Sequence, residues 1–214
     1  MIRLSKSLLP PNVTIKSEQD YRRGIVLEIL AEDCHHKCYI CEEKPTTINI
    51  EHIVPHRSSP TLKFDWDNLF IACGHCNNTK QAGYDDILDP TKCDPEEHIA
   101  LSVEITDNLI ERVKIESLTK DYHSMQTAEL LELVYNGGST DIKKIECSNL
   151  RNSHIMPDIR LFYQYIKNYR EEPELGYKET ISKEIDRSSA FSAFKRKIVR
   201  DDPELSVIFA EALK

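Results

Sequence analysis

The sequence predicts an α+β protein in which a small cysteine-rich core precedes a mainly helical C-terminal region. Two Cys-x-x-Cys pairs enclose short strand-like segments, apolar and polar residues alternate over residues 100–115, and later apolar residues recur at helical spacing. We place a boundary between residues 92 and 93. Residues 1–92 then hold an N-terminal helix and the core, and residues 93–214 hold a β-hairpin and helices.

The composition is that of a folded protein: of 214 residues, 40% are hydrophobic, 30% are charged and six are glycine. No apolar run approaches the roughly 18 residues needed to cross a bilayer, and no basic-then-apolar leader opens the chain. We therefore expect a cytoplasmic protein with no membrane partner. Seven cysteines without an export signal indicate metal ligands or free thiols rather than a disulfide framework.

The N-terminal part contains signals for one helix, two strands and a second, shorter helix. Ser17 is a typical helix N-cap, and the apolar spacing after it predicts a helix over residues 18–33. We expect one strand within residues 47–54 and another over residues 69–72. The polar run over residues 77–81 suits the start of a short helix.

The second half begins with alternating segments at residues 100–105 and 109–115, which predict a hairpin around Thr106-Asp107-Asn108. Everything later has helical spacing, with helices expected at residues 127–135, after Pro157, and at residues 188–200. The last helix is strongly basic. We interpret it as an amphipathic helix with a solvated basic side rather than a dedicated nucleic-acid contact.

Four cysteines have the spacing of a tetrahedral zinc site: Cys38, Cys41, Cys73 and Cys76. The alternative is two unrelated Cys-x-x-Cys pairs or a redox motif. Cys34 is a rival ligand in the first pair, and three histidines nearby could also bind a metal: His35, His36 and His75. Cys93 and Cys147 have no partner at this spacing, and we expect them to be buried apolar residues.

Between the two cysteine pairs lies Glu51-His52-Ile53-Val54-Pro55, followed by Asn68, Asn77 and Lys80. This ordered set, over residues 34–84, resembles the HNH endonuclease family. The resemblance implies a ββα-metal fold that holds one divalent cation. It also implies that His52 is the general base, that Glu51 and Asn77 are metal ligands, and that Asn68 orients the loop and the imidazole.

Three further residues are candidates for contact with the substrate. By position in the resemblance Lys80 would face the phosphate, and Arg57 and His56 follow the motif closely. Taken singly, each residue of the motif has an ordinary structural interpretation, such as a turn residue, a helix cap or an exposed polar side chain. Their order in one short window favours the catalytic interpretation.

The residue types suit phosphodiester hydrolysis independently of the resemblance. A neutral histidine can deprotonate water at cellular pH, while carboxylate and amide oxygens are hard ligands that favour Mg²⁺ or Mn²⁺. Thiolates are soft and keep Zn²⁺ at the structural site. The sequence departs from the fullest HNH pattern at Glu51, where aspartate is commoner, and at Asn77, where some members have histidine; both residues keep a hard donor.

The run Ala190-Phe191-Ser192-Ala193-Phe194-Lys195-Arg196, after an HNH core and a helical segment, resembles the HNH subunits of Septu-type anti-phage systems and of retrons that carry the same pair. This resemblance implies an ABC-type ATPase partner and, in retrons, a reverse transcriptase with its non-coding RNA and DNA. A net charge of -8 argues against tight binding of DNA or tRNA by this chain alone. We expect Phe191 and Phe194 to anchor the partner on a docking region.

Two other functions remain open at this point. One is a stand-alone restriction or toxin nuclease, which would cut without a partner. The other is a zinc-braced nucleic-acid-binding module without catalysis, which would keep the cysteines but lose the base or its metal ligands. Because Glu51, His52, Asn68 and Asn77 are all present, the endonuclease interpretation is favoured.

Overall fold

The computed structural model describes residues 1–106 and 109–214. The N-terminal helix expected over residues 18–33 is two helices, α1 (Glu18–Arg22) and α2 (Gly24–Asp33). They separate because Gly24 adopts a positive φ of 67°, which glycine reaches without steric cost. The predicted N-cap position of Ser17 is confirmed, and the carboxylate of Asp20 accepts from the backbone amide and the hydroxyl of Ser17 at 2.8 and 3.0 Å.

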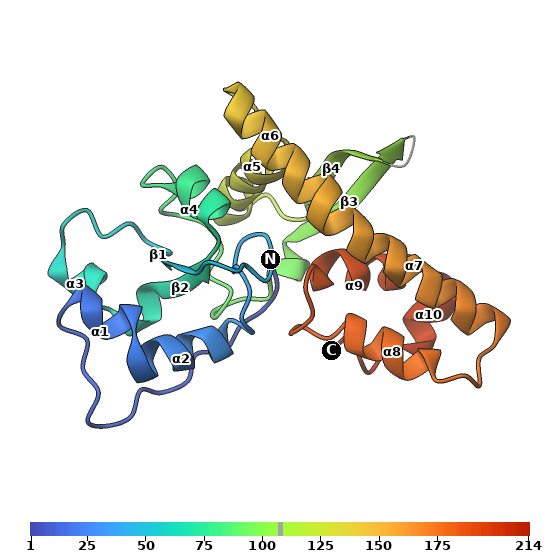
Figure 1. Ribbon diagram of the computed structural model, residues 1–214, viewed down its shortest axis with the longest axis horizontal. Helices are drawn as coiled ribbons and strands as arrows, with labels where there is room; N and C mark the ends of the chain where they lie inside the picture. Colours follow the sequence, from blue (N-terminus) through green and yellow to red (C-terminus); the bar gives the residue numbers. More distant parts are fainter. Residues whose placement is uncertain (107–108) are drawn as a thin grey trace.

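The cysteine-rich part has the order strand, strand, helix. Strand β1 (Asn49–His52) pairs antiparallel with β2 (Leu69–Ala72), with Glu51 opposite Phe70, and α4 (Gly74–Lys80) follows at once. Between the strands run the short helices α3 (Pro60–Lys63) and η1 (Trp66–Asn68). Both expected strands are confirmed (Figure 1). The short helix is present but begins at Gly74, so the polar run over residues 77–81 forms its end rather than its start. Strand β2 is buried on both faces, so it forms the centre of this unit.

The expected hairpin is also confirmed. After the turn η2 (Pro95–Glu97), strand β3 (Ile99–Thr106) pairs antiparallel with β4 (Leu109–Ser117). The predicted turn residues Asp107 and Asn108 lie outside the described residues. Helix α5 (Tyr122–Asn136) packs against β4 and ends before Gly137, as the sequence indicated.

A long helical rod crosses the molecule (Figure 1). It joins α6 (Asp141–Asn149), the π-helical segment η3 (Leu150–Ile155) and α7 (Met156–Glu171). Pro157 has no N–H to donate to a carbonyl of the preceding turn. The π-helical segment η3, whose turns are wider, lies just before it, where this hydrogen bond is missing. The chain ends in α8 (Tyr177–Glu184), α9 (Ser192–Asp201) and α10 (Pro203–Ile208), so the helical second half is confirmed.

Two apolar clusters hold the fold together. The main core draws buried residues from both halves of the chain, among them Leu30, Phe70, Val113, Leu131 and Phe194. A second cluster joins α7, α8, α9 and α10, with Phe162, Ile181 and Phe209 at its centre. Because the main core takes residues from both sides of the expected boundary at residue 92, that boundary stays a prediction.

Helix α9 differs from its expected role. Phe191 is 4% exposed and Phe194 is 1% exposed, and Phe194 packs edge-on against Tyr135 at 5.8 Å between ring centroids. The prediction that these two rings anchor a partner is therefore wrong, because they belong to the protein's own core. The helix also starts later than expected, since Phe191 takes a left-handed conformation immediately before it.

The basic side of α9 is partly buried rather than solvated. Lys195 forms an ion pair with Asp158 at 2.7 Å and a second one with Glu184. The guanidinium of Arg196 donates to both carboxylate oxygens of Glu96, at 3.0 and 2.8 Å. These two cations clamp the C-terminal helices in place. No helix in the described part of the chain is long and apolar enough to cross a membrane.

Candidate active site and metal centre

The four paired cysteines come together as a compact cluster. The sulfurs of Cys38, Cys41, Cys73 and Cys76 all lie within 4.8 Å of one another, and all four residues are buried. The sulfurs of Cys41 and Cys73 are 3.8 Å apart. This distance is far longer than a disulfide bond of about 2.05 Å. It equals the sulfur–sulfur distance expected when four sulfurs surround a zinc ion tetrahedrally at about 2.3 Å each. The donor set therefore fits a zinc ion.

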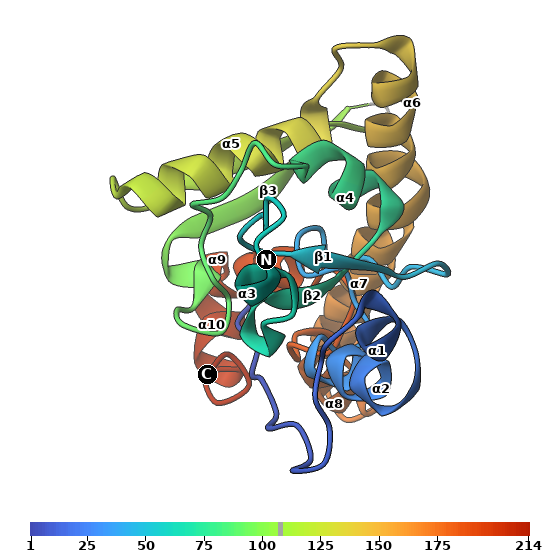
Figure 2. The ribbon, with the colours of Figure 1, turned by 90° about the vertical axis from the view of Figure 1, so that its left-hand side faces the viewer.

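The other candidate ligands lie elsewhere. The sulfur of Cys34 accepts a hydrogen bond from the amide of Ile71, and burial raises the pKa of its thiol to about 11. The imidazole of His36 contacts Glu32, whereas that of His75 contacts the carbonyl of Val134 and the carboxylate of Glu146. His75 thus joins α4 to α5 and α6, which lie beside it (Figure 2).

His52 stands at the end of β1 with its ring held on three sides. Its Nε2 lies 3.0 Å from the carbonyl oxygen of Lys63, and the rings of Tyr21 and His56 lie 6.1 and 4.8 Å away, both edge-on. A carbonyl oxygen can only accept, so Nε2 carries the proton and Nδ1 of the neutral ring keeps its lone pair. Burial lowers the pKa of His52, although the carbonyl of Lys63 opposes this.

Asn68 closes the loop between β1 and β2. Its side-chain oxygen accepts from the amide of Val54 at 2.8 Å, and its amide group donates to the carbonyls of Val54 at 2.9 Å and Leu62 at 2.8 Å. The side chain is buried and all three bonds go to the backbone. Asn68 therefore fixes both arms of the loop, and through Leu62 it holds the neighbouring carbonyl of Lys63 that faces His52.

Glu51 and Lys80 form a buried ion pair beside His52. The ammonium of Lys80 lies 3.0 Å from Oε1 of Glu51 and donates to the carbonyl of His52 at 2.8 Å. Their side chains are 12% and 0% exposed. Burial raises the pKa of Glu51 and lowers that of Lys80, while their mutual attraction opposes both shifts. The short contact and the surrounding hydrogen bonds favour the charged pair.

Asn77 lies on α4, three residues before Lys80 and one after Cys76. Residues three apart share a helix face, so Asn77 lies on the side of α4 from which Lys80 reaches Glu51 on β1. The side chain is half-buried. Glu51 and Asn77 are therefore the residues of this unit that could hold a divalent cation through hard oxygen donors.

The two residues expected to contact phosphate are engaged within the protein. Lys80 is enclosed and directed at Glu51, because its ammonium balances that carboxylate. Arg57 is largely exposed, at 63%, and its guanidinium lies 2.5 Å from a carboxylate oxygen of Asp85. The structure thus corrects the expected orientation of Lys80 toward the substrate.

Some residues around His52 could not be chosen from the sequence. Tyr21 comes from α1, 31 positions before His52, and Lys63 acts through its main chain. The side chain of Lys63 pairs with Glu18 at 2.6 Å, which ties α3 to α1. Nothing in their local pattern distinguished them, because these contacts exist only once α1 has packed beside the strands.

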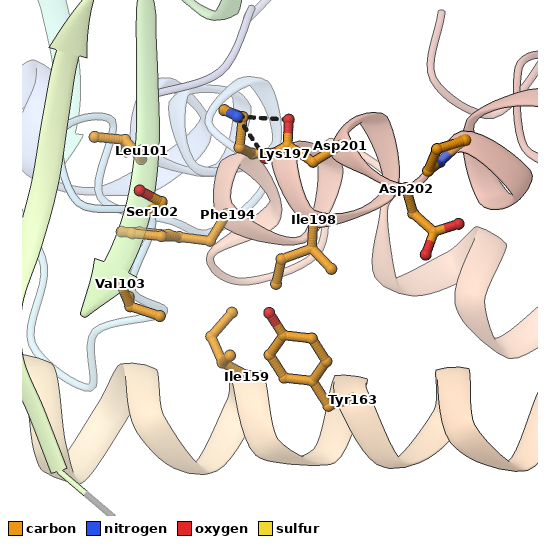
Figure 3. A pocket seen from close by; sticks show the side chains of 11 residues that line it. Leu101, Ser102, Val103, Ile159, Tyr163, Phe194, Lys197, Ile198, Asp201 and Asp202 are labelled. Atoms are coloured by element: carbon orange, nitrogen blue, oxygen red, sulfur yellow. Dashed lines mark hydrogen bonds and ion pairs between the residues drawn. The ribbon is translucent and has the colours of Figure 1, made fainter. Parts of the chain in front are cut away.

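A separate pocket of about 350 Å³ lies between β3, α7 and α9. Figure 3 shows Ile198 from α9 and Ile159 and Tyr163 from α7 turned toward one another, while Phe194 extends toward β3. None of the expected catalytic residues lines this pocket. It is a mainly apolar junction of the C-terminal region rather than part of the site around His52.

Comparison with known proteins agrees with this geometry. Residues 32–83 match the family model for the HNH endonuclease. The matched segment contains the four-cysteine cluster, both strands of the first sheet and α4, and so it coincides with the ββα unit. The chain therefore contains an HNH domain, as the motif order predicted.

The chain is also similar to the Septu protein PtuB of Bacillus thuringiensis. The two are 32% identical over 79 residues, which make up 34% of this chain and 31% of that relative. The match thus spans about a third of the relative's length. No solved structure matches the chain.

Proposed function

We propose that this protein is a metal-dependent HNH endonuclease that hydrolyses phosphodiester bonds of DNA or RNA in an anti-phage defence complex. The observation that carries the proposal is the half-buried His52, whose Nε2 faces the carbonyl of Lys63, beside Glu51 at the end of β1 and across from α4. The match to the HNH endonuclease model and the similarity to a Septu protein support it.

The proposed chemistry starts from the free lone pair on Nδ1 of His52. This atom takes a proton from water, whose oxygen attacks the phosphorus; the bond to the leaving oxygen breaks, and that oxygen takes up a proton from solvent. Asn68 and the carbonyl of Lys63 keep the imidazole in the required tautomer and orientation. A Mg²⁺ or Mn²⁺ ion held by Glu51 and Asn77 would supply charge neutralisation at the phosphate.

In this proposal the four cysteines hold Zn²⁺ as a structural ion. The partner is an ABC-type ATPase like the PtuA of Septu systems, with a reverse transcriptase and its RNA and DNA in a retron. The complex acts in the cytoplasm. The net charge of -8 supports a partner that recruits the nucleic acid, because phosphate binding normally draws on a basic surface.

The test compares the wild type with His52→Ala on plasmid DNA and on total tRNA, in Mg²⁺ or Mn²⁺, with and without a PtuA-like ATPase. Removal of a general base lowers the rate by about 10²- to 10⁴-fold, so we expect metal-dependent cleavage that the variant loses. His36→Asn is the matched control, since the exposed imidazole of His36 contacts Glu32 outside the site.

Equal cleavage by wild type and His52→Ala would contradict the mechanism. Cleavage by the chain alone that the ATPase leaves unchanged would favour a stand-alone restriction or toxin nuclease. Binding of nucleic acid without cleavage under every condition would favour a zinc-braced binding module.

A further inference from the structure

A second cavity adjoins the loop between β1 and β2. It has a volume of about 590 Å³, and the loop residues Val54, Leu62 and Asn68 form part of its wall. The opposite wall comes from the connector over residues 85–93 and from the start of α5. Neither His52, Glu51 nor Asn77 lines it, so this cavity is distinct from the candidate catalytic site but shares its loop.

The cavity has apolar walls and an acidic rim. Its apolar residues are Ile53, Val54, Leu62, Ile87 and Leu88. Its acidic residues are Asp65, Asp67, Asp85, Asp86, Asp89 and Asp121. The basic residues that line the cavity are Lys92, His98 and His123. The lining therefore carries a strong excess of negative charge.

Only part of that charge is balanced by the protein. Arg57 pairs with Asp85 at 2.5 Å, and Lys92 pairs with Asp89 at 2.7 Å. For the other four aspartates, the described residues provide no lysine or arginine within ion-pair distance. Asp121 has His98 at 3.5 Å. The carboxylates of Asp65, Asp67 and Asp86 are thus available to an incoming cation, whereas that of Asp121 already accepts hydrogen bonds from Thr119 and Ser124 as the N-cap of α5.

Charge and shape together narrow the choice of occupant. The carboxylates repel the phosphates of a nucleic acid. A bare metal ion needs converging ligands, and the described residues that line this cavity include no group of three or more histidine, cysteine or acidic side chains that converges as the four cysteines do. A peptide segment that combines an apolar side chain with lysine or arginine would fill the apolar walls and pair with the rim.

We propose that this cavity docks a segment of a protein partner in which an apolar side chain is flanked by lysine or arginine, and that docking stabilises the loop that holds His52. The effect on His52 rests on the proposed nuclease function. The docking itself does not.

The hydrogen bonds of the loop provide the connection. Val54 and Leu62 line the cavity and are both bonded to Asn68, at 2.8 to 2.9 Å. The residue after Leu62 is Lys63, whose carbonyl lies 3.0 Å from Nε2 of His52. An occupant that packs against Val54 and Leu62 therefore restricts the same backbone that orients the imidazole.

The experiment uses a fluorescein-labelled octapeptide of alternating leucine and arginine, with binding to the full chain followed by fluorescence anisotropy. Two control peptides replace either every arginine by glutamate or every leucine by glycine. The test variant is Asp67→Asn/Asp86→Asn. The matched control, Glu172→Gln/Glu174→Gln, removes two exposed charges far from the cavity in sequence.

We expect the leucine-arginine peptide to bind and the two control peptides to bind at least about tenfold more weakly. The Asp67→Asn/Asp86→Asn variant should also lose about tenfold in affinity, whereas the matched control keeps the wild-type value. Hydrogen exchange of the amides over residues 53–68 should slow when the peptide is bound.

No binding, or equal binding to the two double variants, would overturn the docking site. If the glycine-arginine peptide bound as tightly as the leucine-arginine peptide, the binding would be a general attraction for cations. That result would also overturn the docking site. Binding without slower exchange over residues 53–68 would overturn the link to the loop. The His52→Ala variant should bind the peptide as the wild type does. If the wild type binds the peptide but cleaves no nucleic acid, the proposed nuclease function is refuted and the docking site is not.

Discussion

At the scale of single residues, Lys80 balances the charge of the carboxylate beside His52. Its ammonium is fully enclosed and directed at Glu51, the proposed metal ligand. A carboxylate that is to bind a divalent cation needs positive charge beside it before the cation arrives, since an unpaired buried charge is costly. Lys80 thus stabilises the charged form of Glu51 when no divalent cation is bound.

We predict that Lys80→Met destabilises the protein by about 3 kcal/mol when no divalent cation is added, because Glu51 loses its buried partner. Addition of Mn²⁺ should recover more stability in this variant than in the wild type. Thermal unfolding followed by fluorescence measures both effects. Lys80→Met/Glu51→Gln removes both charges and is the control; melting of the single and double variants at the same temperature would contradict the prediction.

Residue types were readable from the sequence, but residue contacts were not. Glu51, His52, Asn68 and Asn77 could be selected because they follow one another in an ordered motif. The enclosure of Lys80 could not be foreseen, since its spacing after Asn77 is equally compatible with an exposed helix residue. Its partner lies 29 positions earlier in the chain and meets it only in the folded unit.

At the scale of elements, the cysteine cluster joins a loop, a two-stranded sheet and a helix, each of which is short. Cys38 and Cys41 lie in a loop without regular structure, whereas Cys73 and Cys76 flank the start of α4. Strand β1 and strand β2 are each four residues long, which is short for an independent sheet. A bound metal ion would connect the loop, the sheet and the helix at one point.

We predict that the purified chain contains about one zinc ion, and that Cys38→Ser releases it and lowers the melting temperature, because a tetrahedral thiolate site contributes directly to folding. Cys93→Ser is the control, since Cys93 lies outside the cluster. Metal content by mass spectrometry and thermal unfolding provide the measurements. Equal zinc content in both variants would count against the metal site.

Where the sequence has a strong local pattern, the observed bounds of the strands agree with those predicted from it. The alternation around β3 and β4 and the apolar run of β2 predicted those strands almost to the residue. The break between α1 and α2 was missed, because a single Gly24 within helical spacing is often tolerated. Helix α6 was not singled out, because it packs little apolar surface on the core and so has no clear apolar stripe. Cys147 is buried, but Ile142 and Ile145 are exposed.

At the scale of the whole molecule, the C-terminal region is fixed to the rest by buried cations. Arg196 donates to Glu96 in the turn before β3 and also to the carbonyls of Ile185, Ala212 and Leu213. The carboxylate of Glu42, just after the first cysteine pair, accepts from the hydroxyl of Ser192 and the amide of Ala193. These contacts join α9 to both the hairpin and the HNH domain.

We predict that Arg196→Met destabilises the protein by about 3 to 5 kcal/mol, because it leaves the buried Glu96 without its main partner. Lys197→Met is the control, since Lys197 forms only a partly exposed pair with Asp201; it should change stability by less than about 1 kcal/mol. Urea unfolding followed by circular dichroism measures both. Similar effects of the two substitutions would contradict the clamp.

The carbonyl of Lys63 has a consequence for how this protein can vary. The atom that orients His52 belongs to the main chain, and every amino acid supplies the same carbonyl. The side chain at position 63 therefore takes no part in the proposed orientation of His52; it pairs with Glu18 and lies over the ring of Phe64. A relative can change this residue, and the surface charge beside the site with it, while the imidazole keeps its place.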